Sequence, residues 1–216
     1  MITFINDFLP GIMLQQTFIT LAKKYTNDDR LINTLWEEIE KNYSGKKRHY
    51  HTLTHLDNLV SQLGEIKTQI SDWDTVLFSV FYHDVIYNAS AKDNEEKSAV
   101  LAEKRLISIS FPADKIKNCV AQILATKAHT QSNDNDINLF TDADLSILGQ
   151  SRDAYIDYFK NVRKEYSIYP DFLYNPGRKK VMQHFLNMER IFKTDFFFNK
   201  FETAARKNLT YELQLL

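Results

Sequence analysis

An acidic residue stands where an apolar one is expected between residues 71 and 87. Leu77, Val80 and Phe81 occupy positions i, i+3 and i+4 of an apolar helical stripe. The next position of this stripe, i+7, is Asp84, and His83 directly precedes it. A carboxylate on an inward face costs free energy unless it is paired or bound to a metal. The pattern therefore predicts a paired or metal-bound carboxylate at this position.

Two further segments carry the same kind of interruption. His55 shares its apolar stripe with three leucines, Leu56, Leu59 and Leu63. Asp144 lies four residues after Phe140 and four before Leu148, so it also points inward. Three helices are thus expected to direct candidate ligands to the interior. Two imidazoles and two carboxylates suit a divalent ion, with Mn, Ni, Co, Fe, Mg or Zn as candidates.

Cysteine usage argues against a structural zinc site. The chain has one cysteine, Cys119, whereas structural zinc sites usually take cysteines in closely spaced pairs. An open site that holds a water and a substrate oxygen is therefore the better interpretation. A zinc peptidase is disfavoured, because the sequence has no HExxH motif. A single cysteine fits a reducing compartment, and a cytoplasmic protein is expected.

The elements that must position these residues are predicted to be helical. Only 5 glycines and 4 prolines occur in 216 residues, too few for most sandwich, propeller or nucleotide-binding folds. Hydrophobic residues make up 44% of the chain, mostly at helical spacing. We expect an all-α bundle of about eight to ten helices. The predicted helices cover residues 12–25, 28–43, 54–70, 71–87, 94–109, 112–127, 139–148, 152–168, 178–192 and 195–215.

Breaks between these helices have their own signals. The polar segment 130–138 is expected to be a surface loop, and Asn175-Pro176-Gly177 is expected to separate two helices. We expect one domain over residues 1–216. It would comprise an N-terminal helical extension (1–29), a core around the metal site (about 48–150) and C-terminal helices (151–216).

Charge and hydropathy limit the partners. The chain has 27 basic and 28 acidic residues, so no overall field attracts a nucleic-acid polymer or an anionic membrane. No stretch of about 18 apolar residues is present to span a bilayer. The segment 196–198 (Phe-Phe-Phe) with Phe201 is expected in the core. Any exposed part of it would favour a homodimer.

The residue order His55, His83-Asp84, Asp144 resembles the HD-domain superfamily of metal-dependent phosphohydrolases. The match extends to six segments that are similar to a bacterial branch of predicted HD phosphohydrolases: residues 48–55, 81–87, 93–99, 142–149, 174–178 and 204–209. The resemblance covers roughly residues 30–213. It implies a helical bundle and makes these four residues the metal ligands. Asp142 is an alternative, although the carboxylate followed by Leu145 matches the family pattern better.

The resemblance implies hydrolysis of a phosphate ester by attack of a metal-bound hydroxide. The expected substrate is a small phosphorylated metabolite, with a nucleotide as the leading candidate. Asp84 would bind the metal and help to orient the water. Glu95 and His129 are the candidates for an acid or base, and Glu96 is an alternative ligand or a support for one. The candidate phosphate contacts are Arg48, His51, Lys127 and Arg178.

Other interpretations stay open. Glu95 and Glu96 also suit a helix N-terminus as favourable negative charges, and Arg178 also suits a helix start after a glycine turn. The same metal centre would support a phosphodiesterase or pyrophosphohydrolase. With two irons it would support oxygenase chemistry, with His129 or His51 as an extra ligand. A non-catalytic module that binds metal and nucleotide for regulation is the alternative from another class.

Overall fold

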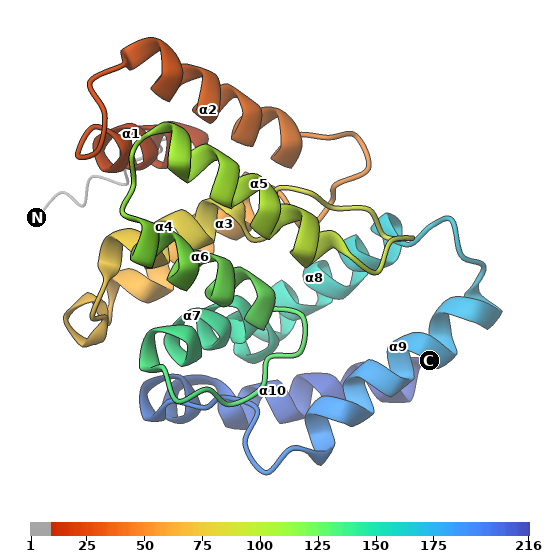
Figure 1. Cartoon of the computed structure of the whole chain (residues 1–216). Helices are drawn as coiled ribbons and strands as arrows, with labels where there is room; N and C mark the ends of the chain where they lie inside the picture. The colour runs from red at the N-terminus through yellow and green to blue at the C-terminus, as the bar shows by residue number, and fades with distance from the viewer. Residues whose placement is uncertain (1–9) are drawn as a thin grey trace, which may run out of the picture.

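Ten α-helices and two short 3-10 helices build the part of the chain that this computed structural model describes, residues 10–216 (Figure 1). No strand occurs within these residues, so the all-α prediction is confirmed. None of the described helices combines the length and apolar character needed to cross a bilayer. The helices are α1 Pro10–Ala22, α2 Asp29–Tyr43, α3 Leu53–Gly64, α4 Trp73–Tyr82, α5 Asn94–Ser108, α6 Ala113–Ala125, α7 Asn135–Leu145, α8 Arg152–Glu165, α9 Asp171–Asn187 and α10 Asp195–Leu215, with η1 Lys67–Gln69 and η2 Ser146–Gly149.

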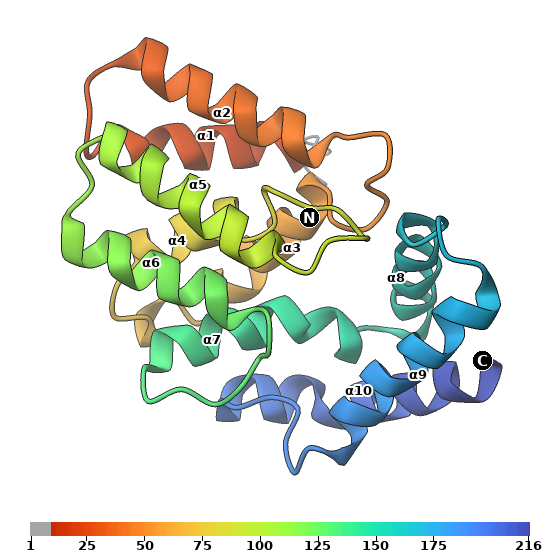
Figure 2. The ribbon, with the colours of Figure 1, turned by 45° about the vertical axis from the view of Figure 1, so that its right-hand side comes forward.

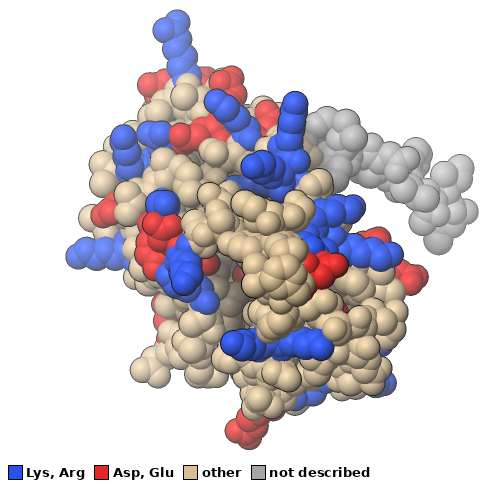
Figure 3. Space-filling model, turned by 90° about the vertical axis from the view of Figure 1, so that its right-hand side faces the viewer, with Lys and Arg blue, Asp and Glu red and all other residues tan. Residues whose placement is uncertain are grey.

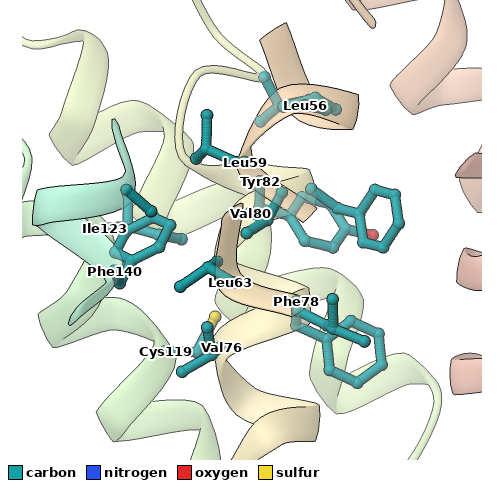
Figure 4. Close-up of a cluster of buried hydrophobic side chains, with 14 of the residues drawn as sticks. Leu56, Leu59, Leu63, Val76, Phe78, Val80, Tyr82, Cys119, Ile123 and Phe140 are labelled. Carbon is teal, nitrogen blue, oxygen red and sulfur yellow. The ribbon is translucent and has the colours of Figure 1, made fainter. Parts of the chain in front are cut away.

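Helix α4 lies at the centre of the bundle. Every residue from Thr75 to Tyr82 is buried, as expected for a helix enclosed on all sides. Helices α3, α5, α6 and α7 pack around it. Figure 4 shows side chains from α3, α4, α6 and α7 that meet in this core, among them Leu59, Val80, Ile123 and Phe140. The two segments that carry His55 and His83 are therefore anchored in a rigid core.

Helix α1 packs into the same core. The ring of Phe18 lies 5.2 Å from that of Phe81 and 6.0 Å from that of Trp36, measured between centroids. The part of the expected N-terminal extension that begins at residue 10 is therefore integrated into the bundle. Residues 1–9 of that extension lie outside the described residues.

The ends of α3 and α4 differ from the sequence prediction. Helix α3 ends at Gly64 rather than near residue 70, and α4 spans 73–82 rather than 71–87. Asp72, not Ser71, caps α4 by accepting a hydrogen bond from the Thr75 backbone N–H at 3.3 Å. The buried Asp136 carboxylate also accepts the backbone N–H groups of residues 71 and 72. The Asp136 contacts come from a distant helix, α7, so local sequence signals did not reveal them.

Two breaks that the sequence predicts between helices differ in the structure. Helix α7 begins at Asn135, inside the expected loop 130–138, because Asp134 accepts the backbone N–H of Asp136 at 2.9 Å. Helix α9 runs through Pro176, so the predicted break at 175–177 is wrong. Pro176 removes a single N–H near the start of the helix, and the residue one turn before it, Phe172, is 75% exposed. Water can therefore satisfy the freed carbonyl.

Helices α8, α9 and α10 form a second group beside the central bundle (Figure 2). Arg178 of α9 donates two hydrogen bonds to Glu212 of α10, at 2.7 and 2.9 Å. Tyr155 of α8 donates to the same carboxylate at 2.6 Å. This buried network joins all three helices. Gly149 allows η2 to lie against α10, since a Cβ atom there would stand 2.6 Å from the carbonyl oxygen of Phe201.

Replacing Gly149 tests this close approach. We expect Gly149→Ala to lower the free energy of unfolding by about 1–3 kcal/mol, because backbone atoms of α10 must shift to admit the methyl group. Gly64→Ala is the matched control, as no atom lies within 4 Å of its Cβ position. Urea unfolding of both variants is the measurement. Equal stability of the two would contradict the packing described for η2 and α10.

Candidate metal centre

Two buried imidazoles face each other at the centre of the site. His55 lies in the first turn of α3 and His83 follows the last residue of α4. Their Nε2 atoms are 3.1 Å apart. The Nδ1 atom of His83 lies 2.9 Å from the carbonyl oxygen of Val80, so Nδ1 carries the proton and donates it. The Nε2 lone pair of His83 is thereby left to face a ligand, as in many metal sites.

A carboxylate lies beside each imidazole. Asp144 Oδ1 is 3.2 Å from His55 Nε2, and Asp84 Oδ2 is 3.2 Å from His83 Nε2. Donor atoms that share one metal ion at about 2.0–2.2 Å are separated from each other by about 3.0–3.6 Å. His55, His83 and Asp144 form the compact group, with ligand atoms all within 4.8 Å of one another. Asp84 adjoins this group through His83.

Charge at this position is unbalanced without a cation. In residues 10–216, histidines are the only basic side chains within 4 Å of Asp84 or Asp144. Burial opposes protonation of His83, but the adjacent Asp84 and Asp144 carboxylates outweigh it and raise the pKa of His83 to about 9. Burial lowers the pKa of His55. Two half-buried carboxylates beside a pair of buried imidazoles suit a divalent ion, which would supply further positive charge.

His129 also belongs to this cluster, which the sequence alone did not establish. Its Nε2 atom lies 2.9 Å from Asp144 Oδ2, the oxygen that faces away from His55. A carboxylate only accepts hydrogen bonds, so Nε2 of His129 is the donor. His129 follows α6 and has a φ of 51°, a left-handed conformation that is uncommon for a residue other than glycine. At this residue the chain turns after α6, and the imidazole lies next to Asp144.

Glu165 is a buried residue of the site that sequence reasoning missed. Its Oε1 atom accepts the backbone N–H groups of His49, Tyr50 and His51 at 2.7–3.0 Å. Its Oε2 atom accepts from His51 Nδ1 at 2.6 Å and from the Tyr87 hydroxyl at 3.0 Å. Burial raises the pKa of Glu165, but these hydrogen bonds prevail and hold it at about 2.

The Glu165 contacts orient His51. The Nδ1 atom of His51 donates its proton to Glu165. This hydrogen bond turns the ring so that Nε2 faces the metal centre, 3.8 Å from Asp84 Oδ2. The only available signal for Glu165 was a charged residue near the end of an amphipathic helix. Such a residue looks like an ordinary surface position, since its partners lie 78 or more residues away in the sequence.

Asp142 points away from the cluster, although it was an alternative ligand. Its carboxylate accepts the backbone N–H groups of Lys193 and Thr194 at 3.0 and 2.8 Å, and lies 2.9 Å from Lys193 Nζ. The side chain is therefore engaged in holding the segment before α10. Of the two carboxylates in Asp142-Ala143-Asp144, only the second one faces the imidazoles.

Arg48 and Glu96 do not line the cavity beside the metal centre. The Arg48 guanidinium donates to the carbonyl oxygens of His51 and Val85, and lies over the rings of Tyr43 and Tyr87. It therefore braces the backbone around the site, and its expected role in binding phosphate is not supported by its position. Glu96 forms an exposed ion pair with Lys127, away from the imidazoles.

Apart from the buried His55 and His83, the remaining candidates line one cavity of about 760 Å³. This volume lies in the range of small-molecule sites. Figure 3 shows a hollow on the face where α8 and α9 lie, with side chains of both charges beside it. The sequence-predicted residues that line the cavity are His51, Asp84, Glu95, Lys127, His129, Asp144 and Arg178. Arg178 is already paired with Glu212, so its charge is partly neutralised within the fold.

Comparison with protein-family models, with curated proteins and with solved structures gives no match for this chain. The resemblance to the HD-domain superfamily therefore stays a prediction. The chemistry of the site rests on its own residues and distances.

Metal binding is the first property to test. We expect isothermal titration calorimetry of the metal-stripped protein with Mn²⁺, Ni²⁺, Co²⁺ or Zn²⁺ to give one strong site. His83→Ala and Asp144→Asn should each weaken binding at least about 100-fold, since a lost ligand should cost no less than a lost supporting residue. His184→Ala, which removes an exposed histidine of α9, is the control. Unchanged affinity in the two site variants would contradict the assignment.

A second prediction concerns Glu165. Replacing it by Gln places an N–H group among hydrogen-bond donors, so we expect unfolding free energy to fall by about 1–3 kcal/mol at pH 7. The native carboxylate has a lowered pKa, so its contribution is full above the ordinary value of 4.5 and is lost as pH falls toward about 2. The stability difference between parent and Glu165→Gln should therefore shrink from pH 6 to pH 2. Glu103→Gln, an exposed control, should show no such change.

Proposed function

We propose that the chain is a metal-dependent phosphoric ester hydrolase of the HD type that removes phosphate from a small phosphorylated metabolite. The observation that carries the proposal is the convergence of His55, His83, Asp84 and Asp144 beside a cavity of about 760 Å³, which the two carboxylates line. This donor set, with nitrogen and oxygen ligands and an adjoining space, is typical of catalytic rather than structural metal sites. A divalent ion in this position would acidify a bound water and polarise a phosphoryl oxygen.

The residues around the ion have separate tasks in this proposal. The near oxygens of Asp84 and Asp144 and the Nε2 atoms of His55 and His83 would hold the ion. Glu165 keeps the proton of His51 on Nδ1, so that His51 Nε2 faces the substrate space. His129 holds a proton at Nε2 and fixes the outer oxygen of Asp144.

Charged side chains at the cavity attract the anion. Lys92 and Lys127 both line it, and Lys127 Nζ also donates to the Lys92 carbonyl oxygen at 2.9 Å. Glu95 lines the same region and remains the candidate for a proton acceptor beyond the ligands. A phosphodiesterase or pyrophosphohydrolase would use the same metal centre, so the substrate panel decides between these reactions.

Hydrolysis by the metal-stripped protein, supplied with Mn, Ni, Co, Mg or Zn in turn, tests the proposal. The panel contains nucleoside mono-, di- and triphosphates, cyclic nucleotides and an aryl phosphate. We expect metal-dependent release of phosphate from at least one monoester. His83→Ala and Asp84→Ala should lower kcat/KM at least about 100-fold, because each removes a side chain that holds the ion.

His184→Ala serves as the matched histidine control and should keep the parental rate. Tight metal binding with no turnover of any ester would contradict the hydrolase. That result would favour the non-catalytic module that keeps its metal for regulation. Cleavage of cyclic nucleotides or of diphosphate linkages, without cleavage of monoesters, would instead identify a phosphodiesterase or a pyrophosphohydrolase.

A further inference from the structure

The cavity beside the metal centre is unusually rich in tyrosine. The lining comprises 26 of the 216 residues, yet it contains six of the chain's 11 tyrosines. They are Tyr50, Tyr87, Tyr158, Tyr166, Tyr169 and Tyr174. Such a concentration is far above an even distribution. It indicates a surface suited to a planar group.

The tyrosine rings form a series of contacts that begins beside the metal centre. The centroid of the Tyr50 ring is 4.9 Å from that of His55 and 4.6 Å from that of Tyr158. Beyond it, Tyr166 lies 5.8 Å from Tyr174 and 6.3 Å from Tyr169. A substrate with its phosphate at the ion would therefore have its organic part beside aromatic rings. Ring contacts of this kind favour another aromatic group over a polyhydroxylated one.

Apolar side chains of α9, the helix that carries Tyr174, also line the cavity. Leu173, Val181 and Phe185 of α9 line it, and Leu173 is 56% exposed although it is a large hydrophobic residue. Burial raises the pKa of Tyr174 to about 12, so its ring stays neutral near pH 7. Neutral aromatic rings and apolar side chains in one lining suit a flat, weakly charged group.

The charge of the lining limits the number of phosphates. Lys92, Lys127 and Arg178 are matched in number by Asp84, Glu95 and Asp144, so the lining is formally neutral apart from its histidines. A bound divalent ion adds two positive charges. A phosphate monoester carries about −1.5 to −2 at pH 7, which balances the ion. A triphosphate would need further cations, whereas Lys127 and Arg178 are already paired with glutamates.

We propose that the cavity selects phosphate monoesters with a planar aromatic group, which the tyrosines of α8 and α9 hold beside the metal centre. The inference rests on the proposed hydrolase function for its phosphate end. The aromatic subsite itself depends only on the lining residues. Tyr158 is its central residue, since its ring contacts Tyr50 on the metal side and lies 5.3 Å from the Arg178 guanidinium.

Two matched pairs of compounds test this inference. Adenosine 5′-monophosphate and ribose 5-phosphate share a phosphate and a ribose but differ in the aromatic base. We expect kcat/KM to be at least about tenfold higher for the former, the equivalent of one good aromatic contact. Phenylphosphonate and methylphosphonate, which are not hydrolysed, should differ about as much in binding affinity by calorimetry in the presence of Mn²⁺.

Variants connect the preference with the tyrosines. Tyr158→Leu should remove most of the preference in both pairs, and Tyr158→Phe should keep it because the ring remains. Tyr166→Leu provides a second variant, with circular dichroism and thermal melting as folding checks. Tyr211→Leu, on α10 and outside the cavity lining, is the tyrosine control and should keep the parental preference.

The two proposals fail in different ways. Hydrolysis of both esters at equal rates, together with equal affinity for the two phosphonates, would overturn the aromatic subsite while the hydrolase stands. Preference for phenylphosphonate that is lost in Tyr158→Leu, without hydrolysis of any ester, would support the subsite while the hydrolase fails. A preference that persists in both leucine variants would also overturn the subsite.

Discussion

Two carboxylates placed beside two buried imidazoles impose the main constraint on this fold. Asp84 and Asp144 lie within 4 Å of histidines but of no lysine or arginine among residues 10–216. Buried charge of one sign needs compensation. Without an ion, protonated histidine supplies it, and this is why the pKa of His83 is raised to about 9. A divalent cation satisfies the same requirement with four ligands already in place, so the geometry is that of a preorganised binding site.

The fold holds the four proposed ligands in place through groups that are not ligands themselves. The Val80 carbonyl fixes the tautomer of His83, and His129 holds the outer oxygen of Asp144. Glu165 connects the end of α8 to the segment before α3 and thereby positions His51. Such supporting contacts set the orientation and basicity of metal ligands. The core around α4 provides the rigidity, while the second group of helices, α8 to α10, supplies the other wall of the cavity.

Periodicity was enough to predict the helical class and the inward direction of His55 and Asp144, which lie on α3 and α7. Asp84 lies near the same site, but it follows the end of α4 at Tyr82, so helical periodicity alone does not account for its position. The ends of the helices were harder to predict. The contacts of Asp136 with the segment before α4 are tertiary, and the continuation of α9 through Pro176 depends on exposure. The choice between Asp142 and Asp144 followed the stripe and agrees with the positions of the two side chains. Glu165 had no local signal, since all its partners are distant in sequence. Arg48, by contrast, carried a plausible local signal for phosphate, but its guanidinium binds backbone carbonyls.

The most direct test of the account is to locate a metal ion in the protein. Crystals grown with Mn²⁺ or Co²⁺ and measured at the metal's absorption edge would give an anomalous difference map. We predict one dominant peak, about 2.0–2.3 Å from His55 Nε2, His83 Nε2 and the carboxylate oxygens of Asp84 and Asp144. A peak bound elsewhere, for example at Asp142 or Glu165, or no peak between the two imidazoles at saturating metal, would contradict the central claim.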